Sequence, residues 1–374
     1  MAIICADYVV VGSGITGATI ARQLADSGRD VVVVDRRGHL GGNVHDFEHP
    51  SGIRVHTFGP HYFRTNSEAL WSYINRFGAF YPYRAQVKSW VSGSYETWPL
   101  TRSYIVSVAG LDWKPEHVGQ SENFEQACLA RMPRVVYDRF VCGYTQKQWG
   151  ISPSLLEKEL AARFDVREDD EPDFSRHSRQ GIPREGYAAL MRRMMDGIPH
   201  LLEFDYLRHR ESVRHKKKLI FTGPIDEFFG FDLGKLKYRA QRRVHQFLAE
   251  KSFAQPAGQV NNPGLENGAF IRTLEWKHMM PVQDSMSIQG TVLTREYPFT
   301  PDDPNEYEYP FPDSSNRELY ARYRERASHL SDTLICGRLG EYRYLDMDQA
   351  MARALMWSQH LLTGSDRRPA RGFQ

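Results

Sequence analysis

The sequence has few cysteines, and their positions suggest neither a metal centre nor a disulfide framework. Its four cysteines lie far apart and include no CxxC pair. The chain also lacks an uninterrupted apolar run of about 18 residues, the length that a membrane-spanning helix needs. Its N-terminus has no basic segment followed by a long apolar run, as a secretory signal has. We therefore expect no metal, no membrane partner and a reduced protein of the cytoplasm.

Charge of one sign is not in excess either. Lysine and arginine together number 48, and aspartate and glutamate 46, which leaves a formal net charge of +2. Nucleic acids and acidic membrane surfaces attract proteins with a marked basic excess, so we expect neither as a partner. The chain does have length and apolar content: its 374 residues, 41% of them apolar, suffice for two or three packed domains.

The most informative stretch lies near the N-terminus, at residues 8–35. An apolar run at 8–11 leads into a GxGxxG turn, a helix-period segment follows, and a second apolar run at 31–34 ends at Asp35. The turn glycines are Gly12, Gly14 and Gly17. The first permits a tight turn, the second lets the backbone approach a pyrophosphate, and the third allows close helix–sheet contact. An acid after the second strand suits a ribose diol, so this stretch predicts a dinucleotide site.

The segment after the acid distinguishes FAD from NAD. It reads RRGHLGGN, from Arg36 to Asn43, and contains a second glycine pair. This pair resembles that of flavoproteins with two dinucleotide-binding domains, in which it runs beside the ribityl phosphate. FAD is therefore the predicted cofactor, with Arg36, Gly42 and Asn43 among its ligands.

The rest of the chain predicts two further structural units. Residues 219–224 form a strand that returns to the first sheet, residues 100–160 show helical periodicity, and residues 240–300 alternate as in an antiparallel sheet. We also predict a helix after Asn66 and a last helix after Asp348, each with that residue as its N-cap. The fold class is therefore α/β: a Rossmann-like FAD-binding domain with an inserted helical bundle and an antiparallel β-sheet domain.

The predicted domains interleave along the chain. The FAD-binding domain takes residues 1–80, 197–235 and 329–374; the helical domain takes 100–170, with a mobile substrate loop at about 163–180; the sheet domain takes 81–99, 181–196 and 236–328. Acidic and then basic residues in the loop also fit a segment that is solvated and has no further role. By the same reasoning, His61 alone fits an ordinary loop histidine, and the aromatic residues of the helical segment fit a core.

Nine stretches are distinctive when taken together. They are VVVGSGITGA, GHLGGN, HTFGPHYFRTN, GYTQKQWG, RQGIPREGY, FTGPIDEFF, LGKLKYRA, EWK and GRLGEYRYLDMD. With them the chain resembles, over nearly its whole length, the UDP-galactopyranose mutase family in its short bacterial form. The resemblance implies an enzyme that interconverts the pyranose and furanose forms of a nucleotide sugar. It also implies that FAD must be reduced, although no net redox change occurs, because the flavin N5 displaces UDP and forms a covalent adduct with the sugar.

The resemblance further implies roles for individual residues. Arg163 and Arg272 match a pair that clamps the diphosphate, and two planar guanidiniums suit that group. The catalytic set is His61, Arg163, Arg272, Tyr309 and Tyr344. Positions that match the flavin site are His61, Arg338, Tyr344, Asp346 and Met347. Positions that match the base and sugar sites are Phe140, Tyr144, Trp149, Arg239 and Asn262.

The chain departs from the family pattern near the substrate. Arg64 stands where the family has a second histidine, and we expect it to contact a substituent on the sugar, as in an N-acetylamino or otherwise modified hexose. Phe174, Ser175 and Val141 also differ from the usual aromatic residues, which leaves the identity of the base open. A UDP-sugar is the predicted substrate, with Phe174 among its contacts.

Two other functions stay open on the sequence. An FAD-dependent oxidoreductase of the amine-oxidase type shares the nucleotide turn, and so does a flavin-holding protein without activity. Two separated arginines with two tyrosines suit a diphosphate better than they suit the aromatic cage of an amine site. Family members of this length are often dimers, so the resemblance leads us to expect a homodimer.

Overall fold

The computed structural model describes residues 3–364, and a five-stranded parallel sheet lies at the centre of its nucleotide-binding domain. The strand order is β10-β2-β1-β11-β17, and the register places Val10 beside both Val33 and Ile220. The strands are β1 (Ile4–Val11), β2 (Val31–Val34), β10 (His200–Leu201), β11 (Val213–Phe221) and β17 (Thr333–Ile335). Three distant parts of the chain therefore build one sheet, and the predicted return of residues 219–224 to it is confirmed for 219–221.

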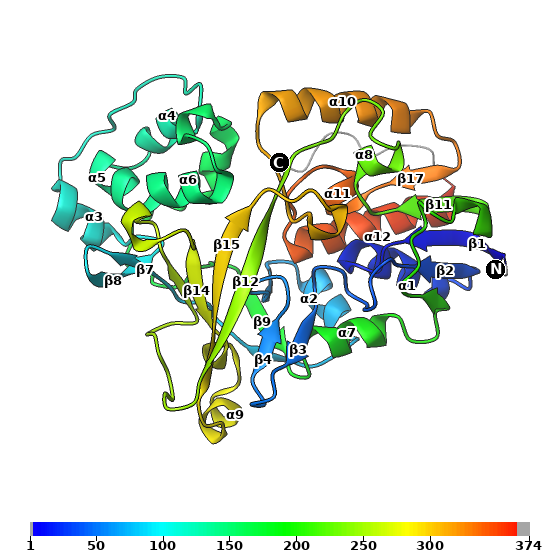
Figure 1. Cartoon of the computed structure of the whole chain (residues 1–374), viewed down its shortest axis with the longest axis horizontal. Coiled ribbons are helices and arrows are strands. Elements are labelled where there is room, and N and C mark those ends of the chain that lie inside the picture. Colours follow the sequence, from blue (N-terminus) through cyan, green and yellow to red (C-terminus); the bar gives the residue numbers. More distant parts are fainter. Residues whose placement is uncertain (1–2, 365–374) are drawn as a thin grey trace.

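Both faces of this sheet are buried, because adjacent residues of β1 pack into different cores. Val10 packs with Ile20 and Leu24 of α1 (Ile15–Asp26), whereas Val9 packs with Phe221 and Phe228. α1 lies against α12 (Met347–Thr363) and α7 (Tyr187–Met194), and Figure 1 shows these helices beside the strands. Covering both faces is what a parallel sheet of continuous apolar strands requires.

A second, larger sheet has the order β16-β12-β15-β14-β13-β7-β8. Its strands are β7 (Val87–Val91), β8 (Ser94–Trp98), β12 (Tyr238–Leu248), β13 (Gln259–Asn261), β14 (Arg272–Glu275), β15 (Thr291–Phe299) and β16 (Tyr309–Pro310). The predicted antiparallel sheet is present, but β7 and β13 pair in parallel. The two strands lie far apart in the chain, and the apolar–polar alternation within each strand does not determine whether they pair in parallel.

A helical layer covers one end of the larger sheet (Figure 1). Its α-helices are α3 (Arg102–Ala109), α4 (Phe124–Leu129), α5 (Arg134–Val136) and α6 (Gly143–Trp149). A π-helical segment, Tyr137–Cys142, links the last two, and a 3₁₀ helix, Lys158–Arg163, follows them. Their apolar side chains share a core with Val87 and Trp98 of the sheet, so bundle and sheet form one packed unit.

Two small sheets and five further helices complete the fold. The sheets are β3 (Asp46–Glu48) with β4 (Arg54–His56), and β5 (Phe63–Thr65) with β9 (Arg179–Pro183) and β6 (Phe80–Pro82). The helices are α2 (Glu68–Asn75), α8 (Ile225–Phe228), α9 (Val282–Ser287), α10 (Ser314–Ser328) and α11 (Gly337–Gly340). Within residues 3–364, no helix has the length and apolarity to cross a bilayer.

Two predicted helix caps are wrong by one or two residues. Ser67, not Asn66, caps α2, because the Asn66 side chain accepts a hydrogen bond from the Ser178 N–H at 2.9 Å instead. Asp346, not Asp348, caps α12, where it forms a capping box with Gln349. A contact with a distant residue therefore decides which residue caps α2, and a reciprocal hydrogen bond decides which residue caps α12.

Two details of the predicted boundaries differ from the structure. α7 packs on α1, and α10 packs on α8 and β17, although both were assigned to the sheet domain. β11 begins at Val213 rather than at the predicted residue 219, because the segment from residue 213 to residue 218 also pairs with β1. The ends of the predicted FAD-binding domain, 1–2 and 365–374, lie outside the described residues.

Candidate active site

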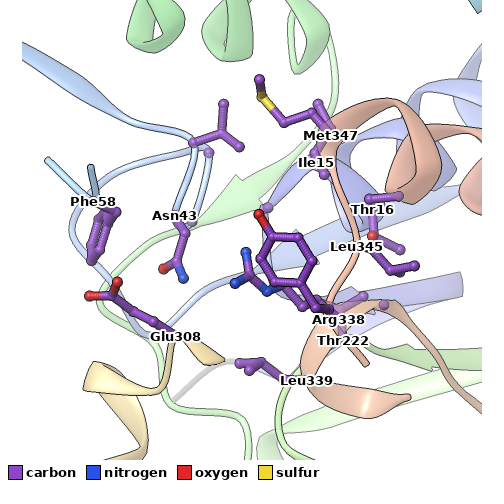
Figure 2. Close-up of a pocket in the computed structure, with 18 of the residues that line it drawn as sticks. Ile15, Thr16, Asn43, Phe58, Thr222, Glu308, Arg338, Leu339, Leu345 and Met347 are labelled. Carbon is purple, nitrogen blue, oxygen red and sulfur yellow. The ribbon is translucent and has the colours of Figure 1, made fainter. Parts of the chain in front are cut away.

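A cavity of about 860 Å³ lies between the nucleotide-binding domain and the larger sheet. Its lining begins at the glycine turn. It includes residues of the loop that carries His61, here called the histidine loop, of the 3₁₀ helix of the helical layer and of the segment before α12. Figure 2 shows Thr16 and Thr222 on one side of it, and Phe58 and Glu308 on the other. The cavity therefore brings together residues from both halves of the molecule.

The glycine turn has the close contacts that the motif predicts. Gly12 has a φ of +101°, and a Cβ placed on Gly17 would lie 1.9 Å from the Gly12 carbonyl oxygen. A Cβ on Gly42 would lie 3.0 Å from the Gly14 Cα. Side chains at these positions would force the helix from the strand or close the cavity floor, so the backbone itself forms this wall.

The acid after β2 is held by the turn. Asp35 accepts hydrogen bonds from the backbone N–H and the hydroxyl of Ser13, at 2.7 and 2.6 Å, and from the Arg37 N–H at 2.9 Å. Its carboxylate is buried and lines the cavity. These bonds fix the rotamer of Asp35 at the end of the cavity nearest the turn.

Of the two adjacent arginines, Arg37 extends along the cavity. Arg36 also lines it but forms an ion pair with Glu227 at 2.7 Å. Arg37 donates to Asn43 Oδ1 at 2.7 Å and to the Asn305 carbonyl at 2.8 Å. Only Arg36 was predicted as a cofactor ligand. Two adjacent arginines indicate that one of them can reach the cofactor, but the sequence does not show which side chain points along the cavity.

His61 is neutral in this setting. Burial lowers its pKa to about 3, with a further contribution from His56. Its Nδ1 lies 2.8 Å from the Gly59 carbonyl oxygen, so Nδ1 carries the proton and donates, which leaves Nε2 as an acceptor. Its backbone N–H donates to His56 Nδ1 at 2.9 Å. The loop thus presents an uncharged imidazole to the cavity.

Two tyrosines and two arginines stack on one another in the lining of the cavity. The rings of Tyr309 and Tyr344 lie 6.0 Å apart and nearly parallel, at 11°. The guanidinium carbon of Arg338 is 4.4 Å from the centre of the Tyr344 ring, and that of Arg163 is 4.1 Å from it. Burial raises the pKa of Tyr309 to about 12, so its hydroxyl remains a hydrogen-bond donor at neutral pH.

Arg272 faces the same cavity and is anchored by a carboxylate. It forms an ion pair with the fully buried Glu296, which also pairs with Arg243 at 2.8 Å. Burial opposes ionisation of Glu296, but the two arginines outweigh it and lower the pKa of this carboxyl. Glu296 therefore stays charged and holds Arg272 in place.

Arg64 lies over two aromatic rings and is oriented by an acid. Its Nη2 donates to Asp346 Oδ2 at 2.9 Å, and Asp346 Oδ1 accepts from the Tyr344 hydroxyl at 3.2 Å. Its guanidinium carbon lies 5.5 Å from the Phe174 ring centre. Arg64, Phe174 and Asp346 all line the cavity, and so does Met347.

Five predicted substrate contacts do not line this cavity. Phe140 and Trp149 belong to the buried core of the helical layer. Arg239 donates to the Gln148 carbonyl at 2.7 Å, and the Asn262 side-chain amide donates to the Phe270 carbonyl at 3.0 Å. Tyr144 lies outside the lining. Burial raises the pKa of its phenol, and the nearby Arg272 opposes this rise. Phe140 and Trp149 match the core interpretation, and the substrate contacts of all five residues stay predictions.

The comparisons with known proteins bear on the whole chain. The model of the UDP-galactopyranose mutase family matches residues 139–344, and that of an NAD(P)-binding Rossmann-like domain matches residues 10–77. The chain is 30% identical over 373 residues to the probable UDP-galactopyranose mutase of Klebsiella pneumoniae, covering 96% of this chain and 95% of that protein.

The chain belongs to the UDP-galactopyranose mutase family.

As a member of this family it is an enzyme, a mutase with the fold of a flavoprotein. A second mutase is nearly as similar: the dTDP-fucopyranose mutase of Escherichia coli is 28% identical over 370 residues, covering 94% of this chain and 97% of that protein. A solved structure, that of a reduced UDP-galactopyranose mutase, has a TM-score of 0.74 over 97% of this chain and 96% of that one. Its 14% identity means that this match concerns the fold alone.

Proposed function

We propose that this mutase uses reduced FAD to interconvert the pyranose and furanose forms of a nucleotide-activated hexose. The observation that carries the proposal is the single cavity that joins the glycine turn to Arg163 and Arg272. A dinucleotide on the turn and a diphosphate between the arginines then share one enclosed space. The family membership supports the reaction class, whereas the form of the flavin, its covalent role and the sugar are our inference.

The residues of the cavity fit FAD rather than a smaller group. The glycine turn has no room for side chains where a pyrophosphate would approach, and α1 begins there with free N–H groups. At the other end, Arg338 lies beside the tyrosine pair, and its buried Nε has no hydrogen-bond partner within residues 3–364. Gly42 and Asn43 line the path between the two ends. Met347 also lines the cavity (Figure 2).

When bound, reduced FAD would supply a nucleophile for the anomeric carbon, from which the nucleoside diphosphate leaves, with no net change of oxidation state. The protein must then hold the departing anion. Arg163 and Arg272 supply forked donors for it, and the Tyr309 hydroxyl supplies a further one. The neutral His61 offers Nε2 as an acceptor without adding a charge that competes with the flavin.

The sugar is proposed to be galactose or an N-acetylamino or otherwise modified hexose. The names of the relatives, a UDP-galactopyranose mutase and a dTDP-fucopyranose mutase, support variation in both sugar and base. Arg64 is the residue that we assign to the sugar, because its Nη2 is held by Asp346 while the rest of its guanidinium faces the cavity. A UDP-sugar remains the proposed substrate.

We also propose that the enzyme is cytoplasmic and forms a homodimer. Exposed apolar side chains on adjoining strands, Phe47 of β3 and Val244 and Phe247 of β12, support association through this end of the molecule. Light scattering after gel filtration measures the mass directly, and a monomer at micromolar concentration would contradict the dimer.

Chemical trapping tests the function. Dithionite-reduced enzyme is incubated with UDP-galactose, UDP-N-acetylgalactosamine or dTDP-fucose, quenched with cyanoborohydride, and analysed by mass spectrometry for a flavin–sugar adduct. We expect an adduct with reduced enzyme and none with oxidised enzyme, and its mass identifies the sugar. If no donor gives an adduct while an amine is consumed and the flavin is reduced, the enzyme is an oxidase of the amine-oxidase type.

A further inference from the structure

A row of four buried charges runs through the wall of the cavity. Its members, in spatial order, are Glu308, Arg243, Glu296 and Arg272. We propose that Arg243 is a positioning residue, which holds Arg272 in the orientation that binds the nucleotide-sugar diphosphate. The inference rests on the proposed function, because the orientation of Arg272 matters only if this arginine binds the diphosphate.

The register of the larger sheet creates the row. Arg243 of β12 and Glu296 of β15 are direct cross-strand partners, and so are Arg272 of β14 and Glu296. Partners that face each other across adjacent strands project their side chains from the same face. Three neighbouring strands thus place arginine, glutamate and arginine side by side. Glu308, just before β16, completes the row at its outer end.

Each carboxylate oxygen of Glu296 serves a different arginine. Arg243 Nε donates to Oε1 at 2.8 Å, and Arg272 Nε donates to Oε2. Within the described residues, Nε is the only side-chain nitrogen of Arg272 that donates a hydrogen bond, so its two Nη groups remain for a ligand in the cavity. The orientation of Arg272 therefore depends on the orientation of one carboxylate.

That carboxylate has little freedom while Arg243 is present. The side chain of Glu296 is 0% exposed and that of Arg243 is 8% exposed. Arg243 also donates to both oxygens of Glu308, each at 2.9 Å. Without Arg243, the buried carboxylates would lose their shared partner, and Glu296 would be free to turn with Arg272. Two positive and two negative groups also balance, so the row adds no net charge to the diphosphate site.

The row supports the histidine loop as well. A Cβ on Gly59, which has a φ of +89°, would lie 3.0 Å from Glu296 Oε1 and 3.3 Å from Arg243 Nη2. The Gly59 carbonyl accepts the Nδ1 proton of His61. The loop that carries His61 thus rests directly on the ion-pair row, and a shift of Arg243 disturbs both walls of the site.

A set of single and double variants tests the proposal. We expect Arg243→Met to weaken UDP binding and to lower kcat/KM by about 100-fold, as small displacements of a binding group do. Arg272→Met lowers both on its own. In UDP affinity the double variant is expected to match Arg272→Met, because Arg243 reaches the diphosphate only through Arg272 and has no further effect on its binding once that arginine is gone. Arg242→Met, which removes the exposed neighbouring arginine, serves as the matched control with near wild-type values.

The outcomes separate this inference from the proposed function. If Arg272→Met leaves UDP binding unchanged, the proposed role of Arg272 itself fails. If Arg272→Met weakens binding but Arg243→Met does not, or if their losses multiply in the double variant, the positioning role is wrong. Should Arg243→Met not retain flavin, Glu308→Gln carries the test: it keeps the shape of the row, and its UDP affinity must fall between wild type and Arg272→Met. An unchanged affinity in that variant would overturn the proposal.

Discussion

The guanidinium carbon of Arg163 lies 4.1 Å from the centre of the Tyr344 ring. Arg163 ends the 3₁₀ helix of the helical layer, whereas Tyr344 precedes α12 of the nucleotide-binding domain. Their contact joins two parts of the chain that share no strand pairing, at the cavity where we propose the diphosphate binds. It also keeps the cation over an aromatic face, which holds the arginine without neutralising it.

Replacing Arg163 is expected to affect the substrate and not the cofactor. Arg163→Ala removes a forked donor from the proposed diphosphate site, so the KM for the nucleotide sugar should rise by about 10- to 100-fold. Flavin content, measured by absorbance, should not change. Arg139→Ala, an exposed arginine of the same layer, is the control. If Arg163→Ala also lost its flavin, the result would point to a structural role for Arg163 instead.

The sugar preference should depend on Arg64. Arg64→His shortens the side chain and removes the ion pair with Asp346. If the guanidinium contacts a sugar substituent, the ratio of kcat/KM for UDP-N-acetylgalactosamine and UDP-galactose should change by about 10-fold. Competition between the two donors measures this ratio directly. A variant that slows both donors equally would show that Arg64 organises the site and does not select the sugar.

Gly17 is expected to be essential for a reason of space alone. In Gly17→Ala the new methyl would lie 1.9 Å from the Gly12 carbonyl oxygen, so α1 must move from β1. Overpacking against backbone of this kind costs of the order of 3 kcal/mol. We expect a lower unfolding temperature and loss of bound flavin. Gly38→Ala is the matched control, because its Cβ would meet only the end of the Glu203 side chain, at 3.4 Å. A Gly17→Ala protein with full flavin content would contradict this account.

Asp226 gives the protein a pH-dependent stability. Burial raises the pKa of this carboxyl to about 6, against 3.8 in an exposed setting. Between about pH 4 and pH 6 the folded protein keeps a proton that the unfolded chain releases, so the free energy of unfolding falls as the pH rises through this range. Asp226→Asn removes this effect and retains an oxygen for the Leu236 N–H. It should be more stable than wild type by about 2–3 kcal/mol at pH 8 and by little at pH 4.

Urea unfolding of both proteins at several pH values checks the Asp226 prediction. The quantity of interest is the difference between the two free energies of unfolding, which cancels the titration of all other groups. We expect this difference to grow from pH 4 to pH 6 and then to stay constant. A difference that does not vary with pH would mean that Asp226 is ionised in both states or neutral in both.

Local geometry explains what could be predicted from the sequence. The turn at Gly12 and Gly17 depends on residues within one strand, turn and helix, so their spacing is sufficient to identify it. The same holds for the return of residues 219–221 to the sheet, because a continuous apolar strand must be covered on both faces. Helix caps depend on more than local sequence, since Asn66 and Ser67 are both good caps and the hydrogen bond from the Ser178 N–H to Asn66 decides between them.

Residue order over short stretches was enough to predict the nucleotide turn, the fold class and the family. Which side chains meet in the cavity depends on contacts between distant parts of the chain. In the structure Arg36 pairs with Glu227, Phe140 packs in a core, and Glu296 lies between Arg243 and Arg272. The physical reason is register: which side chains stand opposite one another depends on how strands far apart in the chain align, and no local pattern contains that alignment.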